Sequence, residues 1–236
     1  MILHYGNKAY AENPYTGPNT PEMLEAFGRY VAFMVTTFKD RVYAWEIWNE
    51  PDHSHIWQPA SNSKEYSQLV NYVAPIIRKI DPGALIVAGA LSGPKWEYLH
   101  SLRDSGALRA VDVVSFHWYT HPKAPDDLTA ETNFNQVRSF VAAIKGLGKR
   151  AWITEMGYPT STDGYGVTET QQATYLQKQI ELAAQMGVER CFIYDLIDDG
   201  PDNKMGDRFG LFRLDDSAKP AVKVINQINS GLTSTK

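Results

Sequence analysis

Two glutamates in this sequence each end a short apolar segment. Glu50 ends the segment YAWEIWNE, and Glu155 ends the segment RAWITE. Aromatic or apolar neighbours at a strand tip should partly desolvate a carboxyl group, which favours its protonated form and suits a general acid. A second, ionised carboxylate can serve as a nucleophile. We therefore predict that Glu50 and Glu155 form a catalytic pair of carboxyl groups, in which Glu50 is suited to be the general acid. The alternative for Glu50 is a solvated acid in a loop.

The distance between the two carboxyl groups would decide the chemistry. If both segments are strands of one barrel, both acids project over the same mouth of that barrel. Enzymes that cleave glycosidic bonds with retention place two such groups about 5 Å apart, whereas inverting enzymes leave about 6.5–9.5 Å for a water molecule. The sequence predicts the pair of acids and leaves their separation open.

Histidine and aromatic side chains are the next candidates. In the segment VDVVSFHWYT, strand alternation places His117 and Tyr119 on one side, although ordinary strand packing would give the same pattern. Trp57 lies in the segment after Glu50, and Tyr194 lies in the last predicted strand. Rings can stack on sugar faces, but most aromatic residues only pack. We predict that Trp57 and Tyr194 contact the substrate, and we predict the same for His117 and Tyr119.

Further polar residues receive a structural interpretation. Glu46, deeper in the first of these strands, is expected to be a barrel-interior residue paired with a cation. His121 is expected to be an exposed loop histidine. Asp195, Asp198 and Asp199 do not match the spacing of a calcium-binding loop, and we interpret their segment as a polar loop near the cleft. The sequence predicts neither a bound metal ion nor an organic cofactor.

Short β-branched or aromatic runs alternate with longer segments of helical periodicity, which predicts six βα units around a parallel sheet. The predicted strands are 1–6, 42–48, 85–89, 111–119, 151–155 and 190–195. The predicted helices are 21–38, 63–80, 95–104, 132–146, 168–186 and 218–228. Long loops follow the strands and short turns follow the helices, as in a barrel with its active site on the C-terminal face. A doubly wound sheet would carry a G-x-G-x-x-G segment, and LIVAGALSG misses that spacing.

The segments WEIWNEPD and WITEMGYP resemble the two catalytic strands of glycoside hydrolase clan A. In that clan an Asn-Glu pair ends the fourth strand of a TIM-type (β/α) barrel and supplies the acid/base, and a Glu ending the seventh strand is the nucleophile. The resemblance implies these roles for Glu50 and Glu155, and it implies that Asn49 binds the hydroxyl next to the anomeric carbon. It also implies that His117 and Tyr119 contact the sugar and the nucleophile, with the tyrosine hydroxyl stabilising the carboxylate.

Within the clan, the chain most resembles family 39, the β-xylosidase and exopolysaccharide-hydrolase group. The resemblance covers essentially the whole chain and includes the segments HYGNKAY, FHWYTHP, ITEMGYPTS, YDLIDDG, FGLF and KPA. Matching WEIWNEPD to strand four makes the first strand here the clan's third. The resemblance therefore implies six of eight βα units in a single catalytic domain over residues 1–236, without the clan's second-strand arginine. Because open sheet edges invite association, we expect a homo-oligomer in which each chain covers the gap of another.

The composition is that of a packed globular protein. Hydrophobic residues make up 43% of the chain, the formal net charge is -4, and Lys and Arg are scattered, so nucleic acid is not an expected partner. The N-terminal segment lacks a signal-peptide pattern and no apolar run suits a membrane span, which predicts a soluble protein of unknown compartment. The single cysteine, Cys191, allows no intrachain disulfide and is expected in a buried strand.

Three functions are compatible with the sequence. The leading hypothesis is hydrolysis of β-linked bonds in an oligo- or polysaccharide by double displacement. The second is a carbohydrate-binding or self-assembling barrel that has lost turnover. The third is a metal-dependent lyase or aldolase, for which the sequence offers no well-placed cluster of histidines and acids and no lysine at a strand end.

Overall fold

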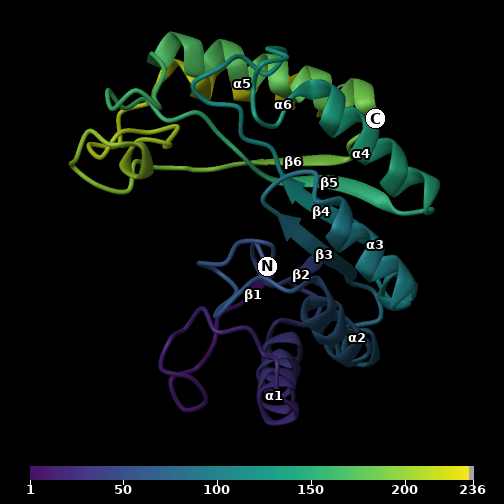
Figure 1. Ribbon diagram of the computed structural model, residues 1–236. Coiled ribbons are helices and arrows are strands. Elements are labelled where there is room, and N and C mark those ends of the chain that lie inside the picture. Colours follow the sequence, from purple (N-terminus) through teal and green to yellow (C-terminus); the bar gives the residue numbers. More distant parts are fainter. Residues whose placement is uncertain (234–236) are drawn as a thin grey trace. The chain divides into compact units, whose positions relative to one another are not determined.

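A computed structural model describes residues 1–233, in which strands and helices alternate (Figure 1). The strands are β1 (Ile2–Leu3), β2 (Ala44–Ile47), β3 (Leu85–Leu91), β4 (Val113–His117), β5 (Arg150–Met156) and β6 (Arg190–Ile193). The α-helices are α1 (Pro21–Phe38), α2 (Ser63–Ile80), α3 (Trp96–Asp104), α4 (Phe134–Gly146), α5 (Glu169–Met186) and α6 (Pro220–Thr233). Two short 3₁₀ helices, at Ala107–Arg109 and Met205–Asp207, were not predicted from the sequence.

The strands follow one another in the sheet in chain order, from β1 to β6. The pairs β1–β2, β2–β3 and β3–β4 are parallel, with Glu46 opposite both Ile2 and Val87. A doubly wound sheet would reverse its strand order at a switch point, so the consecutive order excludes that alternative. The fold is an incomplete TIM-type barrel of six βα units, as the sequence predicted.

The chain divides into two compact units, and the boundary between them runs through β4 and β5. The first unit contains Met1–Phe116 and Ala143–Trp152, and the second contains His117–Ala142 and the chain from Ile153 onward. The first unit therefore carries Glu50, and the second carries Glu155.

The helix boundaries follow local capping signals. The Thr20 hydroxyl accepts the Met23 N–H at 3.2 Å and Pro21 occupies the first turn, while the Asn62 side chain accepts the N–H groups of Lys64 and Glu65 at 3.0 and 3.2 Å. The predictions 21–38 and 63–80 are confirmed at both ends. Strands β1, β2, β4 and β6 are shorter than predicted, most clearly β1, whereas β3 and β5 are each longer than predicted by two residues.

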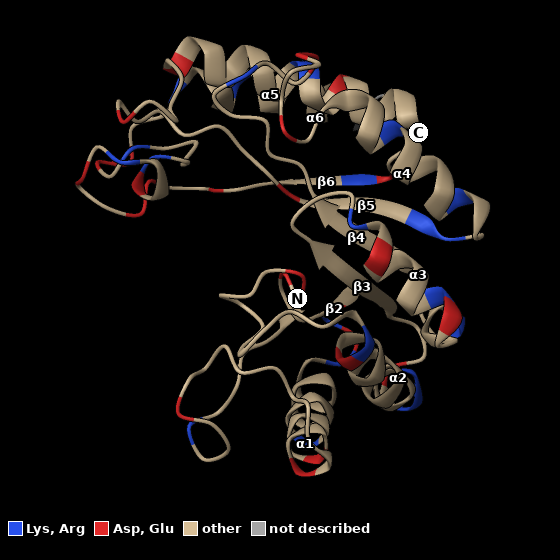
Figure 2. Ribbon diagram, viewed as in Figure 1, with Lys and Arg blue, Asp and Glu red and all other residues tan. Residues whose placement is uncertain are grey.

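The sheet provides an apolar base for the site residues. Val87, Val113 and Trp152 form a buried cluster in the first unit, and Figure 2 shows strands β3 and β4 without Lys, Arg, Asp or Glu. Cys191 lies on β6 as predicted but is only half-buried; partial burial still raises the pKa of its thiol to about 12. Among residues 1–233, no helix has both the length and the apolar character needed to cross a membrane.

Candidate active site

The backbone that carries Glu50 leaves the regular strand before it reaches this residue. Strand β2 ends at Ile47, and Trp48 and Glu50 have φ values of 67° and 42°, which lie in the left-handed region that non-glycine residues rarely adopt. The regular alternation of strand side chains therefore stops before the Glu50 carboxylate. Such strain persists only where surrounding contacts enforce it.

Neighbouring segments supply these contacts. The Glu50 N–H donates to the carbonyl of Ala90, which follows Gly89 in β3, at 2.9 Å. The Tyr98 hydroxyl donates to the Pro51 carbonyl at 2.9 Å. The Asp52 carboxylate accepts both the backbone N–H and the hydroxyl of Ser92, at 2.9 and 2.5 Å. The segment after Glu50 is thus fixed by hydrogen bonds from the next strand and helix.

A cluster of aromatic rings supports the same segment from below. Trp48 is fully buried, and its ring centroid lies 5.7 Å from that of Phe27 and 5.3 Å from that of Trp57. Its indole N–H donates to the Ile56 carbonyl at 3.1 Å. The residues just before Glu50 are therefore fixed by packing against buried aromatic rings.

The prediction that Trp57 stacks on a sugar is wrong. The side chain is fully buried, and its indole N–H donates to Glu65 at 3.1 Å. A Cβ atom at Gly17 would lie 2.2 Å from the indole ring, so a backbone segment covers this side chain. Trp57 fixes the loop after Glu50 and offers no ring face to a ligand.

Glu46 and Asn49 are the other two polar residues of this region. Glu46 is buried, as predicted, and accepts the Ser115 hydroxyl at 2.6 Å, whereas its pairing with a cation stays a prediction. The Asn49 Oδ1 atom is buried, and no hydrogen bond to it is formed within residues 1–233. An unsatisfied buried acceptor costs about 1–3 kcal/mol, so Asn49 can gain by accepting a hydroxyl hydrogen from a ligand.

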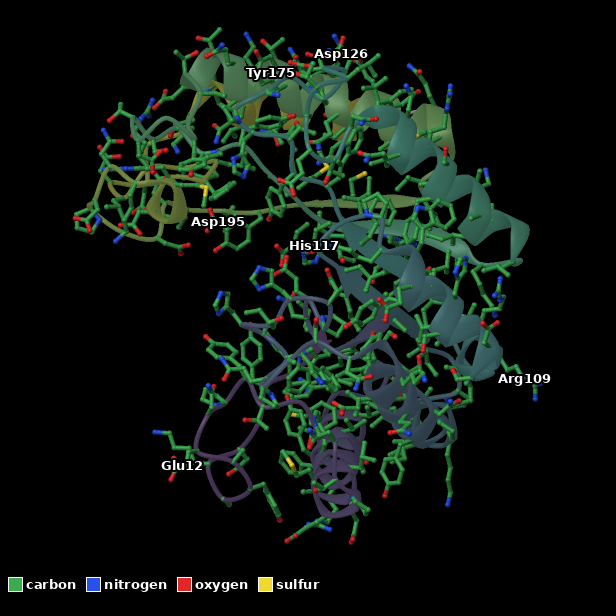
Figure 3. The ribbon with its side chains drawn as sticks, viewed as in Figure 1. Glu12, Arg109, His117, Asp126, Tyr175 and Asp195 are labelled. Atoms are coloured by element: carbon green, nitrogen blue, oxygen red, sulfur yellow. The ribbon has the colours of Figure 1, made fainter. Side chains whose placement is uncertain are left out.

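In the second unit, two side chains from the end of β4 contact the carboxylate of Glu155. The Tyr119 hydroxyl donates to Oε2 at 2.8 Å, and His117 Nδ1 lies 3.5 Å from the same oxygen. The Glu155 side chain is 23% exposed and His117 is 1% exposed. Figure 3 shows His117 at the end of its strand. The predicted grouping of His117 and Tyr119 with Glu155 is therefore present.

Phe209 holds the aromatic residues around this carboxylate, and we did not single it out from the sequence. Its ring centroid lies 5.8 Å from that of Tyr119, 5.5 Å from that of His121 and 5.4 Å from that of Tyr194. His121 is half-buried in this cluster, so its prediction as an exposed loop histidine is wrong. Phe209 begins the segment FGLF, and only that segment's family resemblance pointed to it.

Tyr194 and Asp195 follow strand β6. A Cβ atom at Gly157, the residue after β5, would lie 2.2 Å from the Tyr194 carbonyl oxygen, so this close approach requires glycine. The Tyr194 hydroxyl donates to Asp199 at 3.2 Å, and burial raises its pKa to about 12. Burial, together with the charge of Asp199, raises the pKa of the Asp195 carboxyl to about 7.

The loop after β6 is held by a buried ion pair. Lys219 Nζ lies 2.7 Å from Asp198 Oδ1, and Arg208 lies 3.4 Å from Asp198 Oδ2. Lys219 also donates to the Thr160 hydroxyl at 2.9 Å, which ties the loop to the segment after β5. Asp198 is thus paired with two cations of the chain, which agrees with our interpretation of a structural polar loop.

Consecutive βα units with glutamates after β2 and near the end of β5 are the arrangement of the barrel families of glycoside hydrolase clan A. The chain belongs to the Cellulase family (glycosyl hydrolase family 5), whose model matches residues 3–200.

Solved structures and a sequence relative agree with this class. A family 39 glycoside hydrolase from Bacteroides cellulosilyticus WH2 is 26% identical, with a TM-score of 0.79 over 93% of this chain and 48% of that chain. A monomeric β-xylosidase from Caulobacter crescentus CB15 shares the fold, with 22% identity and a TM-score of 0.68 over 87% of this chain and 46% of that one. A β-xylosidase from Geobacillus stearothermophilus is 32% identical over 99 residues, 41% of this chain and 19% of that enzyme. The chain spans less than half the length of these relatives.

Proposed function

We propose that this protein hydrolyses β-linked glycosidic bonds of an oligo- or polysaccharide with retention of configuration, and that residues 1–236 act as a single catalytic domain. The observation that carries the proposal is the carboxylate of Glu155 at the end of β5, which accepts the Tyr119 hydroxyl at 2.8 Å. This hydrogen bond orients one oxygen and leaves Oε1 as the attacking atom.

In the first step, Oε1 of Glu155 forms a bond to the anomeric carbon while Glu50 protonates the departing oxygen. In the second step, Glu50 removes a proton from water, whose oxygen attacks the anomeric carbon and releases Glu155. The buried Oδ1 atom of Asn49, which no other described residue hydrogen-bonds, is suited to accept a hydrogen bond from the hydroxyl next to that carbon. His117 and Tyr194 would contact the bound sugar, and the reaction as written requires neither a metal ion nor a cofactor.

Aryl β-D-xylosides are the first substrates to test, because two relatives are named β-xylosidases. We expect the first product seen by NMR to be the β-anomer, and an α-anomer would reject retention. Glu155→Ala should abolish turnover of every substrate. Glu50→Ala should still form the glycosyl-enzyme from a dinitrophenyl glycoside, whose leaving group needs little protonation. Glu181→Ala, at an exposed position on α5, is the matched control. Equal activity in all three variants would reject both assignments.

We also propose that copies of this chain associate through the two edges of the sheet. Strands β1 and β6 are the edge strands. Large apolar side chains are exposed on these strands, with Ile2 at 37% and Phe192 at 46%, and in the segment after β6, with Leu196 at 64%. Unpaired strand edges with exposed apolar residues favour association. Sedimentation at micromolar concentration should show an oligomer that Leu196→Lys weakens and Phe33→Lys, on the exposed face of α1, does not. A folded monomer at that concentration would reject association.

These exposed edges also favour a second candidate function, a carbohydrate-binding or self-assembling protein with weakened or no turnover. Sugar binding without product release by the wild type would support this candidate over the first.

A further inference from the structure

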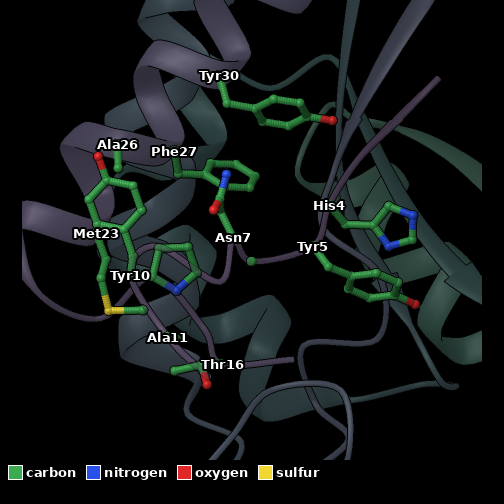
Figure 4. Close-up of a pocket in the computed structure, with 12 residues that line it drawn as sticks. His4, Tyr5, Asn7, Tyr10, Ala11, Thr16, Met23, Ala26, Phe27 and Tyr30 are labelled. Atoms are coloured by element: carbon green, nitrogen blue, oxygen red, sulfur yellow. The ribbon is translucent and has the colours of Figure 1, made fainter. Parts of the chain in front are cut away.

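A pocket of about 290 Å³ lies between helix α1 and the segment that follows β1 (Figure 4). One wall is a single face of the helix, because its residues recur three and four positions apart. These residues are Met23, Ala26, Phe27 and Tyr30. The opposite wall comes from β1 and the following loop and includes His4, Tyr5, Asn7 and Tyr10. None of the residues proposed to act on the glycosidic bond lines this pocket.

The loop wall is anchored and therefore preformed. The Gly6 N–H donates to the Pro14 carbonyl at 2.7 Å, which closes the loop on itself. The Asn13 side chain donates to Gln58 at 2.8 Å, and the Gln58 N–H donates to the Tyr15 carbonyl at 2.9 Å. Since Gln58 lies in the segment that follows Glu50, the pocket is tied to the loop that carries the proposed acid/base.

The lining of the pocket disfavours a charged ligand. It contains no Lys, Arg, Asp or Glu. Burial lowers the pKa of His4, so that this imidazole is neutral at neutral pH. A carboxylate or phosphate in the pocket would lose hydration without gaining a counter-charge, which is unfavourable. A neutral ligand fits this environment.

The lining also combines ring faces with hydrogen-bonding groups. Tyr5, Phe27 and Tyr30 contribute rings (Figure 4). The Nδ1 atom of His4 is buried, and within the described chain no hydrogen bond to it is formed. Asn7, which carries a side-chain amide, also lines the pocket. A pyranose ring presents apolar C–H faces to aromatic rings and hydroxyl groups to such polar atoms.

The geometry points to a subsite for one neutral pyranose unit in the pocket between α1 and the segment after β1. Its volume lies near the lower end of ligand pockets, about 300–1,000 Å³, which suits a single ring. The Tyr5 and Phe27 rings lie 6.0 and 5.7 Å from that of Trp48, which precedes Asn49 and Glu50. The bound sugar unit would thus lie on the Trp48 side of the segment that carries Glu50 and would be a distal part of the carbohydrate chain. This last step rests on the proposed function.

The test is an NMR titration of the ¹⁵N-labelled protein with D-xylose, D-glucose and D-glucuronate. The two neutral sugars should shift the amide signals of residues 4–11 and 23–30 with a Kd on the order of 1 mM, and glucuronate should not. Ala26→Phe places a ring in the pocket and should weaken binding at least roughly 10-fold. Thr36→Phe adds the same ring at an exposed position of α1 and should bind like the wild type.

A second variant covers the case in which Ala26→Phe disturbs folding. Tyr30→Phe keeps the ring, removes only the hydroxyl, and should weaken binding roughly 5-fold. Absent shifts, equal affinities in all variants, or shifts that follow protein concentration instead of sugar would overturn the subsite. The last of these results would assign the pocket to a second copy of the chain.

The titration and the hydrolysis assay can fail separately. Hydrolysis that depends on Glu50 and Glu155 without sugar-induced shifts would reject the subsite alone. Shifts abolished by Ala26→Phe, without such hydrolysis, would support a neutral-sugar site and reject the proposed enzyme mechanism.

Discussion

Glu50 and Glu155 are held in place by different means. Glu50 lies on irregular backbone with a φ of 42°, and hydrogen bonds to Ala90 and Ser92 fix its segment. Glu155 lies on the regular strand β5, and the Tyr119 side chain fixes its carboxylate. Hydrogen bonds to the segment around Glu50 thus determine where the proposed acid/base lies, whereas a hydrogen bond to the carboxylate itself orients the proposed nucleophile.

The difference has a practical consequence. Substitutions around Glu50 should act first on stability and on the position of the acid, because they break backbone anchors. Substitutions around Glu155 should act on the rate of bond cleavage with little loss of stability, because the strand beneath remains intact.

Gly89→Ala should be the most damaging change in the backbone that supports Glu50. Gly89 has a φ of 127°, and a Cβ atom there would lie 2.2 Å from the Ser115 carbonyl oxygen. It lies where the β3–β4 register shifts, and the next residue accepts the Glu50 N–H. We expect the free energy of unfolding to fall by about 3 kcal/mol or more in urea denaturation.

The control for this change is Gly148→Ala. Gly148 also has a positive φ of 70°, but no heavy atom lies within 4 Å of the added Cβ. The free energy of unfolding of this variant should fall by only about 1 kcal/mol, which is the cost of placing alanine in this backbone conformation. If both variants lost the same stability, the close approach to Ser115 would not be the cause.

Tyr119→Phe tests the side-chain half of the contrast. It removes the hydroxyl that donates to Glu155 Oε2 at 2.8 Å and keeps the ring packed on Phe209. We expect kcat/KM for an aryl glycoside to fall about 10- to 100-fold, with the loss in kcat, while Tm changes little. Tyr175→Phe on α5 is the control. A Tyr119→Phe variant that lost stability and kept its rate would break the contrast.

The sequence predicted those parts of the molecule whose causes are local. The N-terminal ends of α1 and α2 follow from Thr20 and Asn62, whose side chains accept hydrogen bonds from the N–H groups of the first helical turn. The irregular end of β2 could not be predicted, because the conformation of Glu50 depends on the carbonyl of Ala90 in the next strand. Trp57 was misplaced for the same reason, since a distant segment at Gly17 covers its ring.

Asp52→Ala tests whether the anchors of the Glu50 segment matter to the reaction. The substitution leaves the Ser92 N–H without its acceptor at 2.9 Å, which should cost about 1–3 kcal/mol of stability. The acid/base should then be less well placed, so kcat/KM should fall more for phenyl than for dinitrophenyl glycosides. Asp52→Asn retains one acceptor oxygen and should lose less. Equal losses for both substrates would show that the anchors serve stability alone.

Asp195→Asn should give the smallest effect, and that effect should depend on pH. Burial and the charge of Asp199 raise the pKa of the Asp195 carboxyl from 3.8 to about 7. Between about pH 4 and 7 the folded chain therefore retains a proton that the unfolded chain releases, so the free energy of unfolding falls as pH rises through this window. Asparagine stays neutral, so the variant should exceed the wild type in Tm by roughly 2–4 °C at pH 8 and match it at pH 4.

The control for Asp195→Asn has the opposite sign. Hydrogen bonds from Ser217 lower the pKa of the exposed Asp215 carboxyl, so the ionised form of Asp215 contributes stability at high pH. Asp215→Asn should lose that contribution above about pH 4 and gain nothing at pH 8. Thermal unfolding followed by circular dichroism from pH 4 to 8 measures both variants. If Asp195→Asn kept the pH slope of the wild type, the slope would belong to other groups, and the loop after β6 would not add pH sensitivity to the region around Glu155.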